Sequence, residues 1–289
     1  MVFPRTRICI CICLLFSVTT WAQLPTKVTV FDINMTDDEL KVSNAVEVPR
    51  EGAYNNQPFF RDNTTLLLSA ERDSQTDILK YDLHSKKKTW ISATPGGEYS
   101  PQPIPDSDAV AAVRLDPDAL QRLYKYNEKR QEISEMIPDL PVAYFSFRTA
   151  RTIIATVLNG DKMDLVSIDL HLKKITPLFT DAGRGIQKIP KSESISYTLT
   201  NEAGKWDIYV MEQNVEDTYF VTELPYEIQD YVWLNDTQIL IGMQSKLYLY
   251  DTFGEGEWTH VANLEDFGLK NISRMSVSPD GKKLAVVSE

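Results

Sequence analysis

The sequence predicts an all-β protein, a six-bladed β-propeller of four-stranded blades whose last blade is closed by an N-terminal hairpin. The first observation is a repeat: short β-rich runs centred on residues 67, 110, 153, 195, 239 and 284 recur at a nearly constant spacing. The second is a polar turn before each run, and the third is a further strand pattern after it. A repeat of about 43 residues that contains four strands is typical of a propeller blade.

The first two strands of each repeat form a predicted hairpin. Polar residues such as Asp62-Asn63, Asn235-Asp236 and Ser278-Pro279-Asp280-Gly281 precede the β-rich runs and supply the dihedral angles and side-chain bonds of tight turns. The runs themselves, which we assign to the second strands, are 66–69, 110–113, 153–156, 195–198, 239–241 and 284–287.

The third strands share a carboxyl-terminal Asp, Asn or Glu, a residue suited to an Asx-type turn. They are 78–82, 123–127, 165–169, 208–212 and 247–251. A polar stretch then leads to a fourth strand, as at 88–91, 174–178 and 257–261.

The sixth repeat contains only its first two strands, within residues 272–289. Residues 28–32 repeat the third-strand pattern, and 40–46 follow as a fourth strand. We therefore expect the N-terminal strands within 26–48 to complete the blade begun by 272–289, which removes the exposed edges of an open array. The predicted domain is residues 23–289.

The N-terminus predicts export. Arg5 and Arg7 precede an apolar run, 8–18, and a small-residue region, so residues 1–22 resemble a signal peptide cleaved after Ala22. The three cysteines, Cys9, Cys11 and Cys13, lie in that run, and the mature chain is expected to hold no disulfide. No later apolar run is long enough for a membrane span. The predicted location is periplasmic or secreted.

Composition argues against several functions. The net charge of -11 disfavours a nucleic-acid binder, which needs a basic surface. His84 and His171 occupy equivalent turns of different predicted blades, an arrangement that disfavours a shared metal, and no Gly-x-Ser-x-Gly motif is present. We predict no catalytic residues, no metal ligands and no cofactor. Calcium bound by the many carboxylates stays open as an alternative.

Residues 273–287, with the turn Ser278-Pro279-Asp280-Gly281, resemble the hairpin of the TolB-like six-bladed β-propellers, which carry WD-like repeats. Segments 56–62 and 99–106 echo it more weakly. The resemblance covers nearly the whole predicted domain and implies the propeller fold. With the signal-like segment, it implies an interaction module of the cell envelope that binds a protein or an extended peptide.

One mouth of a propeller is formed by the loops that enter the first strands and by those that join the second strands to the third. These loops hold acids, amides, arginines and aromatics, a mixture suited to peptide recognition. The candidate binding residues are Tyr54, Asn56, Gln57, Glu71, Arg72, Asp73, Tyr99, Arg114, Trp206 and Asp230. The alternative is that each is an ordinary solvated loop residue.

The rival function is a propeller enzyme, a lactonase-like hydrolase with a divalent cation at the central channel. The acid and amide side chains in the loops of the same mouth suggest this function. The preferred reading is a monomeric binding module whose partner is a protein or peptide, with no nucleic acid and no membrane span.

Overall fold

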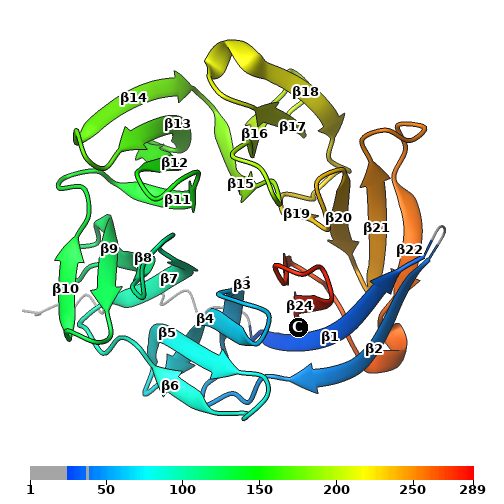
Figure 1. Ribbon diagram of the computed structural model, residues 1–289, viewed down its shortest axis with the longest axis horizontal. Coiled ribbons are helices and arrows are strands. Elements are labelled where there is room, and N and C mark those ends of the chain that lie inside the picture. The colour runs from blue at the N-terminus through cyan, green and yellow to red at the C-terminus, as the bar shows by residue number, and fades with distance from the viewer. Residues whose placement is uncertain (1–24, 37–38) are drawn as a thin grey trace, which may run out of the picture.

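The computed structural model describes residues 25–36 and 39–289. These residues form six four-stranded antiparallel sheets arranged as blades around a central axis, with almost no helix (Figure 1). The predicted propeller is confirmed. The predicted signal peptide and the three cysteines lie outside the described residues.

Each blade runs outward from an inner strand to a strand at the rim. The inner strands are β3 (Asn55–Phe60), β7 (Gly97–Pro103), β11 (Val142–Phe147), β15 (Ala182–Lys188), β19 (Val232–Trp233) and β23 (Arg274–Val277). The second strands are β4 (Thr65–Arg72), β8 (Val110–Leu115), β12 (Thr152–Asn159), β16 (Ile195–Thr200), β20 (Gln238–Met243) and β24 (Lys283–Ser288). The third strands are β5 (Gln75–Asp82), β9 (Gln121–Asn127), β13 (Lys162–Asp169), β17 (Trp206–Met211), β21 (Lys246–Asp251) and β1 (Lys27–Met35). The rim strands are β6 (Lys88–Trp90), β10 (Glu132–Glu135), β14 (Lys174–Phe179), β18 (Thr218–Glu223), β22 (Thr259–Asn263) and β2 (Leu40–Glu47).

Two segments from opposite ends of the sequence form the last blade. The strand order is β2-β1-β24-β23, and β1 pairs antiparallel with β24 from Lys27 opposite Ser288 to Asp32 opposite Lys283. In Figure 1 the blue β1 and β2 lie beside the red β24. The predicted closure by an N-terminal hairpin is confirmed, and it places the ends of the described chain in one sheet.

Short polar side chains shape the hairpins, as the sequence predicts. Asp62 Oδ1 accepts hydrogen bonds from the backbone N–H groups of Thr64 and Thr65, both at 2.8 Å, and Asn235 does the same for Thr237 and Gln238. In the Ser-Pro-Asp-Gly turn, Gly281 has a φ of 70°, a left-handed conformation that glycine adopts without a steric penalty. These local bonds fix where each inner strand reverses into the second.

The blades are held together at their seams. The buried apolar side chains of the described residues gather in six clusters, each of which joins two neighbouring blades. The cluster between blades one and two is the smallest, with Leu67, Ile78, Val110, Ala112 and Tyr126. That seam also contains the buried carboxyl groups of Asp77 and Glu98, which are 2% and 0% exposed.

The topology gives the molecule two different faces. The loops that join second to third strands, and those that link one blade to the next, lie on one face, which we call the loop face. The turns from first to second and from third to fourth strands lie on the other, the hairpin face. The described residues contain no helix long and apolar enough to cross a membrane.

Candidate functional site

Each blade contributes one polar side chain at the start of its inner strand, near the central axis. We call this set the channel ring: Tyr54, Tyr99, Tyr144, Arg184, Asp230 and Arg274. Tyr144, Arg184, Asp230 and Arg274 line a central cavity of about 80 Å³. The other two lie close by, because Tyr54 is within electrostatic range of Tyr99, Tyr144 and Arg274. The ring therefore combines three phenols, two guanidinium groups and one carboxylate.

Irregular pairing of the inner strands positions side chains of the channel ring. Pairing registers shift within β3, β7, β11 and β15, so these strands carry extra residues relative to their second strands. In β15, the three residues between Ala182 and Ile186 face only Thr198 of β16. Bulges of this kind re-aim side chains.

Two glycines make the β15 bulge possible. A β-carbon at Gly183 would collide with Thr198 and Trp206, and one at Gly185 would lie 2.8 Å from the Tyr231 ring. The surroundings therefore leave no room for a side chain at positions 183 and 185. Arg184, between them, carries the one long cationic side chain of this bulge.

The channel ring contains two cationic side chains but only one anionic side chain. Arg184 forms an ion pair with Asp230, and Arg274 Nη1 lies 3.9 Å from the other oxygen of the same carboxylate. The Arg274 guanidinium also lies 5.7 Å from the centre of the Tyr144 ring. Burial acts to lower the pKa of Arg274, but Asp230 and the Tyr144 and Tyr54 hydroxyls outweigh it and raise that pKa, so the group stays charged.

Gln57 lines the central cavity on the side of blade one, in the same segment as Tyr54. Burial, the largest effect, raises the pKa of Tyr54, so its hydroxyl stays protonated. The Gln57 Oε1 atom accepts hydrogen bonds from Ser69 Oγ at 2.9 Å and from the Ser100 backbone N–H at 2.7 Å. This amide joins blades one and two at the channel.

Known structures share this architecture. No family model and no curated protein matches the sequence. A structure from Agrobacterium tumefaciens provisionally assigned as TolB superposes with a TM-score of 0.67 at 15% identity and covers 92% of this chain and 98% of that one. TolB from Acinetobacter baumannii gives 0.60 at 12% identity, over 92% of this chain and 64% of that one. The chain has the TolB-like propeller fold.

The same architecture occurs outside TolB structures. A chain in a structure of a nidogen and laminin complex gives a TM-score of 0.62 at 9% identity and covers 91% of this chain and 98% of that one. At these identities the similarity concerns the fold. The function of this TolB-like propeller has to be argued from its own residues.

In this TolB-like propeller, two of the sequence-predicted site residues, Gln57 and Asp230, line the central cavity, and Tyr54 and Tyr99 lie close to it. Two other predicted residues, Asn56 and Glu71, form hydrogen bonds with the backbone near Tyr54. The buried Asn56 accepts a hydrogen bond from the Gln57 N–H at 2.7 Å, and Glu71 Oε2 accepts one from the Ala53 N–H at 2.8 Å. These two side chains hold the segment that carries Tyr54.

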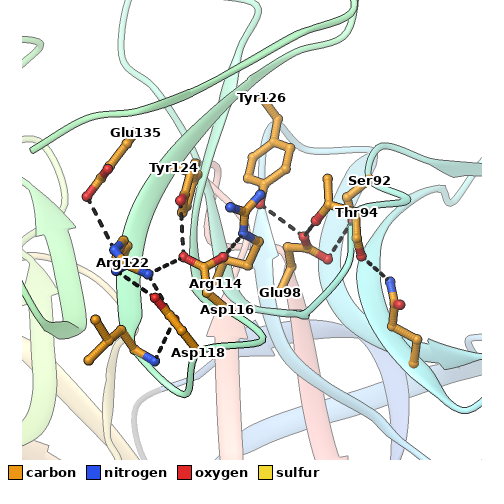
Figure 2. Close-up of polar contacts among 12 residues, drawn as sticks. Ser92, Thr94, Glu98, Arg114, Asp116, Asp118, Arg122, Tyr124, Tyr126 and Glu135 are labelled. Carbon is orange, nitrogen blue, oxygen red and sulfur yellow. Dashed lines mark hydrogen bonds and ion pairs between the residues drawn. The ribbon is translucent and has the colours of Figure 1, made fainter. Parts of the chain in front are cut away.

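Arg72 and Arg114, expected as the charged anchors for a partner, are engaged within the chain. Arg72 Nε donates to Asp77 at 3.0 Å, and its guanidinium lies 4.4 Å from the centre of the Trp90 ring. Arg114 forms an ion pair with Asp116 and lies 3.6 Å from the centre of the Tyr124 ring (Figure 2). Both side chains stabilise the outer parts of their blades.

The remaining two predicted residues do not line the central cavity. Asp73 is exposed in the turn between β4 and β5 on the loop face, with a φ of 49°. Trp206, expected to be the exposed tryptophan, is half-buried and packs against the cluster between blades four and five.

Sequence reasoning missed Tyr144, Arg184 and Arg274. The repeat itself carries a signal for the first, because Tyr54, Tyr99 and Tyr144 stand at intervals of one repeat. The position of Arg184 depends on the β15 bulge, which breaks the alternation from which strands are predicted.

A second polar cluster lies between blades one and two (Figure 2). Glu98 receives hydrogen bonds from the hydroxyls of Thr94 and of Tyr126, the latter at 3.1 Å. Ser92 Oγ lies 3.0 Å from both Glu98 Oε2 and Asp77 Oδ1, and it accepts the Ile78 N–H at 2.9 Å. A single hydroxyl hydrogen cannot serve two carboxylates, so a protonated Glu98 donates to Ser92, which donates to Asp77.

The pKa of Glu98 agrees with this arrangement. Burial is the largest effect and, together with the charge of Asp77, raises the pKa of Glu98 to about 7, while the hydrogen bonds between Glu98 and the hydroxyls of Thr94, Ser92 and Tyr126 act in the opposite direction. Among the residues described, no group of three or more His, Cys, Asp or Glu side chains is placed to hold a metal ion.

Replacing Arg72 by Ala is expected to lower the free energy of unfolding by about 2 kcal/mol, because Asp77 stays buried without its guanidinium partner. Urea titration measures the loss. The matched control is Arg50→Ala, which removes the exposed pair with Glu47, 3.6 Å long and expected to contribute less than about 1 kcal/mol. Equal losses in the two variants would contradict the structural role given to Arg72.

Proposed function

We propose that this TolB-like propeller is an exported interaction module of the cell envelope that binds a protein or an extended peptide on its loop face. The observation that carries the proposal is the central cavity, which residues of all six blades line and to which Tyr144, Arg184, Asp230 and Arg274 of the channel ring contribute. Tyr and Arg are the residue types that most often anchor protein interfaces.

Three further points support the proposal. The fold is that of TolB structures, and another chain of similar fold occurs in a complex of nidogen with laminin. The signal-like segment, 1–22, supports export. The ring holds two guanidinium groups and one carboxylate, a balance that favours an anionic group over the divalent cation of a hydrolase.

The test is affinity capture from the envelope fraction of the native host with two matched double variants. Asp73→Lys with Glu202→Lys reverses two exposed charges in turns of the loop face. Asp106→Lys with Glu255→Lys makes the same change of net charge on the hairpin face. The partner should be retained by the hairpin-face variant and lost or weakened at least about tenfold by the loop-face variant, since charge reversal at an interface costs more than 1.4 kcal/mol.

The opposite result, with loss confined to the hairpin-face variant, would move the binding surface to the other side of the molecule. Equal capture by both variants and the native chain would remove the loop face from the interface. Circular dichroism melts of all three proteins should coincide, because the four acids are exposed.

A further inference from the structure

We propose that the channel ring binds a carboxylate group between Arg184 and Arg274. The inference rests on the proposed function and deepens it, because it names the chemistry that the loop face recognises. A carboxylate of this kind is carried by an acidic side chain, by a peptide C-terminus or by a small organic acid.

The ring has more donors than it can use internally. Each guanidinium has five N–H donors in a planar fork, and both groups share the single carboxylate of Asp230. The contact from Arg274 is long, at 3.9 Å. Within residues 25–36 and 39–289, the buried Arg184 Nε–H has no hydrogen-bond partner. The two guanidinium groups therefore carry more donors than Asp230 can accept, and both line the cavities in which a second carboxylate would bind.

The shape of the site limits the ligand to a small group on a longer chain. The central cavity of about 80 Å³ meets a second cavity of about 170 Å³, and Arg184, Asp230, Arg274 and Met275 line both. The second cavity is bounded by the segment that links β18 to β19 on the loop face. A chain that approaches from this face can therefore place its terminal group between the two guanidinium groups.

The remaining ring members suit a planar anion. Tyr144 lines the central cavity, and its ring centre lies 5.7 Å from the Arg274 guanidinium. Arg184 already binds one carboxylate, Asp230, which shows that the fork and the available space match this group. The Asp230 contact is through Nη2 alone, whereas the planar fork of arginine is able to bind a carboxylate through two N–H groups.

The experiment follows the Nε–Hε signals of Arg184 and Arg274 by nuclear magnetic resonance in the full chain, at constant ionic strength. The probes are acetate, N-acetylglycine as a model C-terminus, and N-acetylglutamate N-methylamide as a model acidic side chain. The neutral N-acetylglutamine N-methylamide and sulfate are the controls. We expect saturable shifts of both signals with the carboxylates and none with the neutral probe. The tightest of the three carboxylates identifies the source of the group.

Substitutions within the ring, with one control outside it, make the test specific. Asp230→Asn removes the competing carboxylate and is expected to increase the affinity at least about threefold. Arg274→Gln should abolish the shift at Arg184, whereas Arg148→Gln, whose guanidinium binds backbone carbonyls on the hairpin face, should leave it unchanged. If Asp230→Asn fails to fold, Arg184→Lys replaces it and should lose most of the affinity, since ammonium cannot form the bidentate contact.

Absence of saturable shifts, or equal shifts with sulfate, would overturn the inference. Such a failure is distinguishable from failure of the proposed function, because capture through Asp73 and Glu202 does not depend on the channel ring. Retained capture with no carboxylate binding refutes this inference alone.

Discussion

Replacing Glu98 by Gln is expected to raise the free energy of unfolding at pH 8 by up to about 3 kcal/mol and to change it little at pH 5. The amide has the same shape as a protonated carboxyl group. It can donate to Ser92 and accept from Thr94 and Tyr126, so the hydrogen bonds between blades one and two persist.

The direction of this pH dependence follows from the difference in proton binding between the folded and unfolded states. In the folded chain the pKa of Glu98 is raised from 4.5 to about 7. Between these values the folded state binds a proton that the unfolded state has lost, so the contribution of Glu98 to stability falls as the pH rises. It is fully present below pH 4.5 and is lost as the pH passes about 7. Glutamine has no such titration.

Urea titrations of both proteins at pH 5, 6, 7 and 8 measure the effect. The difference in unfolding free energy between the Gln variant and the native chain should grow with pH up to about 8. Glu202→Gln, on an exposed turn, is the matched control and should give a small and constant difference. A destabilised Glu98→Gln at pH 8, or parallel pH profiles, would show that folding does not raise the pKa of Glu98.

Replacing Phe31 by Ala is expected to lower the free energy of unfolding by about 3–5 kcal/mol. Phe31 lies on β1, is 0% exposed, and packs edge-on against Phe267 with ring centres 5.1 Å apart. It belongs to the cluster that joins blade six to blade five. The substitution therefore creates a cavity in the seam next to the strand that closes the ring.

Thermal melts should show a fall of about 6 °C or more in the midpoint of a single transition, because β1 belongs to the same sheet as β23 and β24. Val46→Ala on the rim strand β2, where the side chain is 37% exposed, is the control and should cost less than about 1 kcal/mol. Equal effects of the two substitutions would mean that β1 is not part of the cooperative core.

The fold was readable from the sequence because each blade repeats one local pattern. Asp62, Asn235 and the Ser-Pro-Asp-Gly turn mark hairpins through bonds that lie within a few residues, and the spacing of the hairpins then sets the blades. Closure was also predictable, because the third-strand pattern of residues 28–32 lies near the N-terminus, whereas the first two strands of the same blade lie at the C-terminus. These features are local or periodic.

The site was only partly predictable, because its chemistry depends on contacts between strands. Arg72 and Arg114 look like free cations in a loop, yet Trp90, two strands away in the blade, and Tyr124, on the adjacent strand, stack against them. Arg184 reaches the channel through an irregular register, and Asp230 is its partner from the next blade. Neither contact can be predicted from the alternation of side chains along a strand or from the spacing of the repeats.

The most direct test of a binding loop face is photo-crosslinking in the native envelope from one position on each face. Tyr226, 75% exposed in the link between β18 and β19, lies on the loop face, and Leu172, 68% exposed between β13 and β14, lies on the hairpin face. A photoreactive phenylalanine at 226 should crosslink a specific protein that the same residue at 172 does not. Crosslinks confined to position 172, or identical products from both positions, would contradict the account.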